Sequence, residues 1–271
     1  MGMLKSYSRG HQDMAQTANV ICIKWGNKYD ASEVNRLFRM VNAHIKKHNL
    51  AFYCFTDDTQ GLDKSIITKD LPVLNVAPED NRYFYKKEAA LCDDNLGGLK
   101  GQRVLFLDID VVITGSLDDF FEYPKGDEFI TTNDWNTRDD SVGQASCYSW
   151  VVGTIGFVKS DFEAEPKRWI KKYRTASQEY LSYKIIERFG KLNFWPESWV
   201  RSFKFHSLPV WYMRPYVTPV LPEDTRVLCF HGDPKVSDAM MGRWSEKKIP
   251  PLKRLYKTIR PSPWLKKYLS V

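Results

Sequence analysis

A short apolar run that ends in two acids constrains the fold of this chain more than any other feature. The residues at 104–107, Val-Leu-Phe-Leu, are followed at once by Asp108, Ile109 and Asp110. A run of this length and character is typical of a central strand that is covered on both faces. On an extended backbone, Asp108 and Asp110 point to the same side and form a doubly anionic oxygen site. We therefore expect these carboxylates to hold a divalent cation, Mn²⁺ or Mg²⁺, that can bridge to a phosphate.

Strand-like and helix-like segments alternate on the amino-terminal side of this run. Residues 19–23 and 51–55 have the character of strands, and each segment ends in a polar loop. Between them apolar residues recur at helical spacing, and Asp30 can cap that helix. The alternation predicts an α/β fold with a mostly parallel central sheet. Because the carboxyl ends of parallel strands face the ligand crevice, we expect four loop residues there: Lys24, Trp25, Gly26 and Asp57.

Three further predictions concern the second half of the chain. We expect residues 150–158 to form a strand that follows a polar loop. Asp161 is expected to cap a helix that carries Trp169. Ser177 is expected to cap another helix, in which Phe189 faces inward.

The composition indicates a folded chain with one large core, since 43% of the 271 residues are hydrophobic and 14% are aromatic. We expect an arm at 1–18, an α/β domain at 19–241 and a tail at 242–271. No apolar run reaches the roughly 18 residues that span a bilayer, and the first residues lack the apolar core of a signal peptide, so a cytoplasmic location is expected. The five cysteines lie far apart without a CxxC pair, which is typical of reduced core residues.

The tail differs in composition from the rest of a chain whose net charge is +7. Glu246 is the single acid among its nine lysines and arginines, and Leu252, Leu255, Tyr256 and Ile259 share one face if the segment is helical. Basic residues with aromatic neighbours suit an anionic membrane surface, so we expect peripheral attachment to the inner face of the membrane. A packed, solvated helix at the end of the domain is the alternative.

Four stretches together resemble the GT-A glycosyltransferases. They are a Tyr-x-Lys stretch at 83–87, the strand and DxD motif at 104–112, the segment Gly-Ser-Leu-Asp-Asp-Phe at 115–120, and a late His-Gly-x-Pro-Lys element at 231–235. The last element is similar to the His-Gly-Lys signature of the family-eight-like retaining members. The resemblance implies a GT-A (Rossmann-like) fold with a mixed, mostly parallel sheet flanked by helices. It also implies a hexosyltransferase that uses Mn²⁺ (or Mg²⁺) and a nucleotide-diphosphate sugar, usually linked to UDP.

The resemblance also implies roles for single residues. His231 would complete the metal site formed by Asp108 and Asp110, Gly232 would let the backbone approach a phosphate, and Lys235 would neutralise the leaving diphosphate. Further donor contacts would come from Lys86 near the phosphates or sugar, and from Lys24, Trp25, Gly26 and Asp57 at the nucleoside.

The stereochemical outcome depends on which group faces the sugar. In the retaining case that the resemblance implies, Gln178 would be the polar group beneath the sugar; related members often carry acid-Gln-acid where this chain has Ser177, Gln178 and Glu179. An inverting enzyme needs a base facing the acceptor hydroxyl, and Asp134 or Glu179 could serve. The expected acceptor is a glycan or a lipid-linked glycan in cell-surface polysaccharide synthesis.

Two other functions remain open at this point. In a phosphatase of the haloacid dehalogenase type, Asp108 would be the nucleophile, Asp110 the acid and base, and Asp233 with Asp238 the acidic metal motif. That nucleophile loop normally follows the first strand, whereas about two strands precede it here. In a non-enzymatic protein, the basic tail would bind nucleic acid. No RNA-binding or DNA-binding signature is present, so nucleic acid is not expected as a partner.

Overall fold

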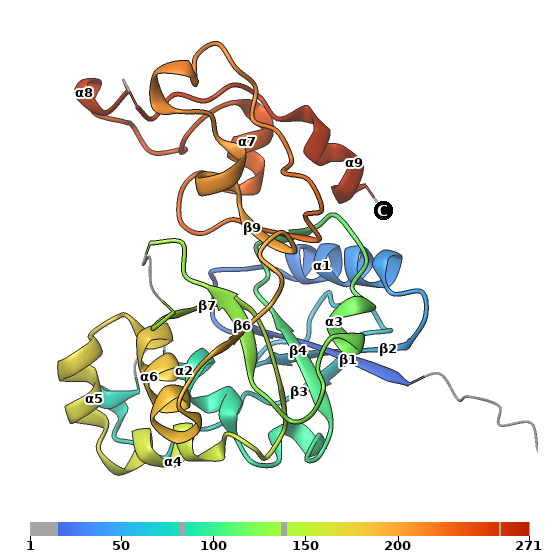
Figure 1. The fold of residues 1–271 in the computed structure, drawn as a ribbon, viewed down its shortest axis with the longest axis vertical. Helices are drawn as coiled ribbons and strands as arrows, with labels where there is room; N and C mark the ends of the chain where they lie inside the picture. Colours follow the sequence, from blue (N-terminus) through green and yellow to red (C-terminus); the bar gives the residue numbers. More distant parts are fainter. Residues whose placement is uncertain (1–15, 82–84, 137–139, 255, 271) are drawn as a thin grey trace, which may run out of the picture.

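The acid-tipped run forms the central strand of a seven-stranded mixed sheet (Figure 1). The computed structural model describes residues 16–81, 85–136, 140–254 and 256–270. The strand order is β3-β2-β1-β4-β7-β6-β8. The strands are β1 (Thr17–Lys24), β2 (Asn49–Thr56), β3 (Ile67–Lys69), β4 (Arg103–Leu107), β6 (Ile130–Asn133), β7 (Gly143–Val151) and β8 (Asn193–Phe194).

Most of the pairs in this sheet are parallel. Strands β3, β2, β1 and β4 run the same way, β7 is antiparallel to both β4 and β6, and β6 pairs in parallel with β8. A small second sheet has the order β5 (Val111–Ile113), β10 (Val227–Cys229) and β9 (Val200–Ser202). The predicted α/β fold with a mixed, mostly parallel sheet is therefore confirmed.

Helices cover both faces of the large sheet (Figure 1). Alternate residues of β4 enter two separate apolar clusters: Leu105 and Leu107 join one, and Val104 and Phe106 join the other. All four side chains are fully buried, which confirms the prediction of a strand covered on both faces. The helices are α1 (Ala31–His44), α2 (Tyr85–Glu88), α3 (Asp119–Glu122), α4 (Gly156–Ala164), α5 (Pro166–Tyr173), α6 (Ser177–Phe189), α7 (Val236–Met241), α8 (Pro251–Arg254) and α9 (Lys266–Leu269).

The first helix begins as the sequence predicts. The Asp30 carboxylate accepts a hydrogen bond from the Glu33 backbone N–H at 3.1 Å, and the Glu33 carboxylate accepts one from the Asp30 N–H at 3.2 Å. This reciprocal pair satisfies two backbone donors at the start of α1. It fixes where the loop after β1 ends, and that loop forms part of the site described below.

The predicted strand at 150–158 is wrong. Strand β7 begins at Gly143 and ends at Val151, and α4 begins at Gly156 after a turn in which Gly153 has a φ of +98°. The apolar residues of the predicted segment therefore belong to a strand end and a helix start. The expected polar loop shortens accordingly, because β7 includes residues 143–145.

Two predicted helix caps are also wrong. Asp161 lies inside α4, and the helix that carries Trp169 starts separately at Pro166, a residue suited to a first helical turn. Ser177 is the first residue of α6, but its hydroxyl donates to Glu88 instead of capping the helix. At the other end of α6, Phe189 is 52% exposed and does not face the core.

The tail packs partly against the domain. Ile259 is 4% exposed, Leu265 is fully buried, and the Trp264 indole donates to the Pro219 carbonyl at 2.8 Å. The predicted helical face is wrong, because α8 ends at Arg254 and Leu252 is 81% exposed; Leu255 lies outside the described residues.

The five cysteines are buried and free, as predicted. In the described part of the chain, no helix has the length and apolar character needed to cross a bilayer.

Candidate functional site

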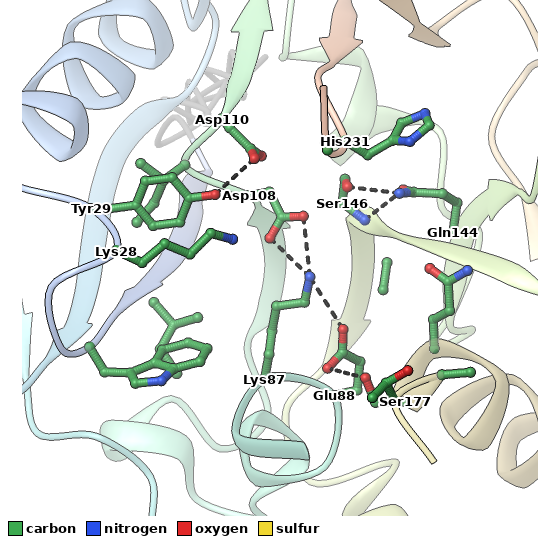
Figure 2. Close-up of a pocket in the computed structure, with 18 residues that line it drawn as sticks. Lys28, Tyr29, Lys87, Glu88, Asp108, Asp110, Gln144, Ser146, Ser177 and His231 are labelled. Carbon is green, nitrogen blue, oxygen red and sulfur yellow. Dashed lines mark hydrogen bonds and ion pairs between the residues drawn. The ribbon is translucent and has the colours of Figure 1, made fainter. Parts of the chain in front are cut away.

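A cavity of about 350 Å³ opens where β1 and β4 end (Figure 2). Parallel strands leave their carboxyl ends at one edge of a sheet, and this edge is the usual ligand position in α/β folds. Six segments line the cavity: the end of β1 and its loop (Ile23, Trp25, Lys28, Tyr29), residues 87–88, 108–110, 144–146, 175–178 and 231–232.

The two acids after β4 lie in this cavity and have different partners. The Tyr29 hydroxyl donates to Asp110 Oδ2 at 2.8 Å. The Lys87 ammonium lies 3.0 and 3.2 Å from the two oxygens of Asp108, and 3.2 Å from Glu88 Oε1 (Figure 2). The Asp108 backbone N–H donates to the Ser146 carbonyl at 2.9 Å, which fixes the strand end that carries both acids. The site is thus a row of three carboxylates with one lysine between two of them.

Burial and mutual repulsion disturb the ionisation of these groups. Burial, and then the neighbouring charge of Asp108, raises the pKa of Asp110 to about 6, against a partial opposing effect of the Tyr29 hydrogen bond. Burial also raises the pKa of Glu88. Burial by itself would lower the pKa of Lys87, but the charges of Asp108 and Glu88 outweigh it and raise the pKa. The described lining thus contains three carboxylates, Glu88, Asp108 and Asp110, but only two lysines, Lys28 and Lys87.

The carboxylate pair fits a hard divalent cation. Two carboxylates separated by one residue are oxygen ligands of the kind that Mg²⁺ and Mn²⁺ prefer, and a cation would relieve the repulsion that raises the pKa of Asp110. Burial, followed by the charge of Lys204, lowers the pKa of His231 to about 4, so its imidazole is neutral at pH 7 as a metal ligand must be.

The orientation of His231 differs from that of a formed metal ligand. Its Nε2 lies 2.7 Å from Ser202 Oγ. Its ring stacks with the rings of Trp135 and Phe205, at centroid distances of 5.4 and 5.7 Å. In Figure 2 the ring points away from Asp110. Within the described ranges, no three His, Cys, Asp or Glu side chains are grouped as a metal site. Both oxygens of Asp108 contact the Lys87 ammonium, so a cation would have to compete with that ion pair, and His231 would have to turn its ring to join the site.

The cavity lining brings together six of the residues that the sequence selects. These are Trp25, Asp108, Asp110, Gln178, His231 and Gly232. They come from the loop after β1, the end of β4, the first turn of α6 and the loop after β10. Segments more than 200 residues apart in the chain thus converge on one place, as the predicted arrangement of strand ends requires.

The other selected residues lie in the described part of the chain but outside the cavity lining. Lys24 is buried and pairs with Asp58 at 3.6 Å, and the Gly26 N–H donates to the Asp57 carboxylate at 3.2 Å. The first contact joins the last residue of β1 to the loop after β2, and the second joins the loops after β1 and β2. Lys86 is half-buried one position before Lys87, the lysine that contacts Asp108.

The remaining three are Asp134, Glu179 and Lys235. Asp134 is buried and accepts a hydrogen bond from the Asn136 backbone N–H at 3.1 Å. Glu179 and Lys235 are exposed. None of these three side chains is part of the lining, which is drawn from the described residues alone.

Sequence analysis did not select several polar groups that line the cavity. Tyr29 was within reach of sequence reasoning, because it lies in the same polar loop as Trp25. Lys87 and Glu88 lie on α2, a helix of four residues that is too short to show which side faces the sheet. Gln144 fell in the segment expected to be a loop. The signal for Glu88 is its contact with Ser177, 89 positions away, and this contact exists only in the folded chain.

No protein-family model matches the sequence, and no curated protein matches it either. Solved structures do match. The galactosyltransferase LgtC, in complex with donor and acceptor sugar analogs, is 14% identical, with a TM-score of 0.54 over 80% of this chain and 88% of that one. An active-site mutant of LgtC is 16% identical, with a TM-score of 0.52 and the same coverage.

A further match is the apo structure of WbbM, a bifunctional glycosyltransferase. It is 13% identical, with a TM-score of 0.50 over 86% of this chain, and the chain spans about half the length of WbbM, 48%. At these identities the likeness concerns the arrangement of helices and strands. The chain therefore has the fold of the GT-A glycosyltransferases, as its DxD strand and its late His-Gly element predict.

Proposed function

We propose that this chain is a metal-dependent glycosyltransferase that moves a sugar from a nucleotide-diphosphate donor to a glycan or lipid-linked glycan. One observation carries the proposal: Asp108 and Asp110 lie side by side in a 350 Å³ cavity at the strand ends of a fold shared with LgtC. LgtC itself was solved with donor and acceptor sugar analogs. A cavity of this size suits part of a small-molecule ligand.

The reaction class explains the charges around the cavity. Glycosyl transfer breaks the bond between the anomeric carbon and a phosphate oxygen, so negative charge grows on the diphosphate. A divalent cation held by Asp108 and Asp110 would act there as a Lewis acid. Lys28 and Lys87 line the same space and are better placed than Lys86 or Lys235 to face the phosphates. Gly232 has a φ of +70° and no side chain, so its backbone can approach an anion closely.

The nucleoside would lie next to the loop after β1. Trp25 is half-buried at the edge of the cavity, where its ring can pack against a base such as uracil. The contacts from Lys24 to Asp58 and from Gly26 to Asp57 hold that loop in place. On this basis we propose a uridine-linked donor.

The positions of the candidate catalytic groups support retention of configuration. Gln178 lines the cavity from the first turn of α6, whereas Asp134 and Glu179, the two candidate bases for inversion, do not. A base for inversion has to reach the acceptor hydroxyl within hydrogen-bond distance. We therefore propose a retaining enzyme with Gln178 beneath the sugar.

A thermal-shift screen tests the proposal. Purified protein is heated with UDP-, GDP-, CMP- and dTDP-sugars, each with Mn²⁺ or with EDTA. At a donor concentration of about 100 times Kd, binding stabilises the folded state by about 2.7 kcal/mol. We expect such a shift with one donor class, only with Mn²⁺, and not in Asp110→Asn. Stabilisation that is equal in EDTA, or that persists in Asp110→Asn, would contradict the proposal.

The phosphatase alternative is disfavoured by the positions of its second acidic motif. Asp238 is buried in α7 and pairs with Arg243. Neither Asp233 nor Asp238 belongs to the described lining that includes Asp108. Phosphate release from para-nitrophenyl phosphate without a nucleotide would restore this alternative.

We also propose that the chain attaches to an anionic membrane surface. Exposed apolar residues at 210–220 include Trp211 and Tyr216, and Arg260 of the tail donates to the Pro215 carbonyl at 3.4 Å. Exposed aromatic side chains beside a basic segment suit lipid headgroups at roughly 1 kcal/mol per cation, and apolar contact would add to that. Nucleic acid would use the charge but not the apolar residues.

Liposome flotation of the full chain tests the attachment. A variant with Trp211→Ser and Tyr216→Ser should lose recovery with anionic vesicles, as should Lys247→Glu with Lys248→Glu. Substitution is preferable to removal of the tail, because Leu265 is part of the core. Recovery equal to that of the unaltered protein in both variants would contradict the proposal, and salt-dependent binding to DNA without vesicle binding would favour nucleic acid.

A further inference from the structure

A third carboxylate lines the cavity in addition to the two acids of the DxD motif. Glu88, the last residue of α2, is only 5% exposed. Its Oε2 accepts a hydrogen bond from Ser177 Oγ at 2.9 Å, and its Oε1 lies 3.2 Å from the Lys87 ammonium. Burial raises the pKa of Glu88, and these two contacts act in the opposite direction by favouring the charged form of the carboxylate. Figure 2 shows Glu88 on the opposite side of Lys87 from Asp108.

The position of Glu88 relative to the cation site indicates which part of the donor would lie next to it. The sugar of a nucleotide-diphosphate donor is bonded directly to the terminal phosphate, which a cation at Asp108 and Asp110 would hold. The anomeric carbon therefore lies one bond beyond that phosphate. Lys87 contacts Asp108 with the same ammonium that contacts Glu88, and Ser177, the partner of Glu88, directly precedes Gln178. A sugar bonded to a phosphate at that cation would thus lie next to Glu88 and the start of α6.

Glu88 is the one acid of the described cavity lining that we do not assign to the cation site. Among the described residues that line the cavity, the acids are Glu88, Asp108 and Asp110. In the proposed function, Asp108 and Asp110 would hold the cation. Asp134 and Glu179, the candidate bases selected from the sequence, lie outside the lining.

We propose that Glu88 is a catalytic residue that faces the donor sugar and stabilises the positive charge that develops at its anomeric carbon. This inference rests on the proposed function. When the bond from the anomeric carbon to the phosphate oxygen breaks, both electrons stay on the oxygen and the sugar ring becomes cationic. The acceptor oxygen then bonds to that carbon, and its proton passes to the departing phosphate. Glu88 remains ionised throughout and forms no bond. Its contribution is a fixed negative charge in a site of low polarity.

A purely structural role for Glu88 would be to hold Lys87 and the start of α6 in place. The two roles differ in what they change. Loss of a charge that acts only as the sugar becomes cationic lowers kcat and leaves donor binding almost intact, whereas loss of a scaffold weakens both.

The experiment measures kcat and Kd with Mn²⁺ and the sugar nucleotide that most stabilises the unaltered protein, with water or an added glycan as acceptor. We expect Glu88→Gln to lower kcat by about 100-fold or more, the loss typical of one electrostatic group, and to leave donor Kd within about threefold. A kcat within about fivefold of the unaltered protein, or a loss of donor affinity equal to the loss of kcat, would overturn the role of Glu88.

A matched pair of shorter variants keeps the test valid if removal of Glu88 disturbs the fold. Glu88→Asp and Glu88→Asn have the same size and differ in charge. The aspartate variant should have a kcat about tenfold or more above the asparagine variant. Equal values would overturn the proposal. Glu223→Gln, at an exposed position outside the cavity, controls for purification and handling.

Failure of this inference can be told from failure of the proposed function. Donor binding that depends on Mn²⁺ and on Asp110, together with an indifferent Glu88→Gln, removes only the role of Glu88. If no sugar nucleotide binds in a metal-dependent way, both are removed.

Discussion

Two walls of the same cavity differ in how the chain builds them. The metal wall consists of Asp108 and Asp110 with Tyr29, and its two acids lie one residue apart directly after the end of β4. The sugar wall consists of Glu88, Ser177 and Gln178, which α2 and α6 bring together from distant parts of the sequence. The two acids are visible in the sequence because they lie close together in it, whereas Tyr29 and the residues of the sugar wall are brought together only by the fold.

The walls also differ in the work that we assign to them. The metal wall binds, because its charges act on the diphosphate in both the ground state and the transition state. The sugar wall acts on charge that appears only as the sugar leaves. Variants of the metal wall should therefore lose binding and rate together, and variants of the sugar wall should lose rate alone. The following predictions test this contrast, from the largest effect to the smallest.

The largest effect is expected for Asp108→Asn. Loss of a cation ligand should lower kcat by about 1000-fold or more, and should also abolish the Mn²⁺-dependent binding of donor. Steady-state kinetics and calorimetry measure the two quantities. Asp127→Asn, an exposed position with the same chemical change, is the control. An Asp108→Asn protein with normal donor binding would break the contrast between the walls.

A smaller effect is expected for Gln178→Ala in the sugar wall. Removal of one polar group next to the reacting carbon should lower kcat by about 10- to 100-fold and change donor Kd by less than about threefold. The same two measurements apply. A large increase in donor Kd with unchanged kcat would show that Gln178 binds the donor and does not act on the rate.

The pH dependence of stability tests the electrostatics of the metal wall. The folded state raises the pKa of Asp110 to about 6 from an ordinary value of 3.8. Its contribution to stability is therefore fully present below pH 3.8 and is lost as the pH rises through 6. In metal-free protein, Asp110→Asn should raise the free energy of unfolding at pH 8 by up to about 3 kcal/mol, and by almost nothing near pH 3.5.

Urea unfolding in EDTA at several pH values measures this difference. Tyr29→Ala at pH 8 provides a comparison, because it removes a neighbour of Asp110 without removing the charge. If Asp110→Asn raises the free energy of unfolding by the same amount at every pH, the pKa of Asp110 is not raised in the folded state and this prediction is wrong.

The smallest effect is expected for Tyr29→Phe. This change deletes the hydroxyl that donates to Asp110 at 2.8 Å and that partly lowers the pKa of the acid. Loss of this hydrogen bond raises the pKa of Asp110, so protons compete better with Mn²⁺. A hydrogen bond to a charged group contributes about 1.5 kcal/mol, so Mn²⁺ affinity near pH 6 should fall by about tenfold or less. Calorimetric titration with Mn²⁺ measures it. Unchanged affinity would separate Tyr29 from the metal wall.

The first half of the fold follows from the sequence because its signals are local. Strands β1, β2 and β4 are apolar runs that end in polar loops, and the Asp30 cap marks the start of α1. These signals lie within a few residues of each other and need no tertiary information.

The second half is less predictable because its signals overlap. The first apolar residues of the run at 150–158 end strand β7, and the last ones begin helix α4. A turn at Gly153 separates the two elements. Ser177 has the chemistry of a helix cap, but the carboxylate of Glu88 competes successfully for its hydroxyl. In the second case a tertiary contact overrides a local preference.

The choice of site residues follows the same division. Asp108 and Asp110 could be selected because they directly follow a buried apolar run. The extended backbone expected through both acids is wrong, because β4 ends at Leu107 and Asp110 lies in a turn. Lys87 could not be distinguished from Lys86, since a helix of four residues offers no periodicity. His231 lines the cavity as expected, but the direction of its ring could not be predicted. It depends on contacts with Ser202, Trp135 and Phe205, which lie far from it in the sequence.

Binding of UDP to protein freed of metal with EDTA, followed by isothermal calorimetry with and without added Mn²⁺, tests the central claim most directly. If Asp108 and Asp110 hold a cation that grips a diphosphate, UDP should bind about 100-fold more tightly with Mn²⁺, and Asp110→Asn should remove that gain. Equal UDP affinity in EDTA and in Mn²⁺ would contradict the account.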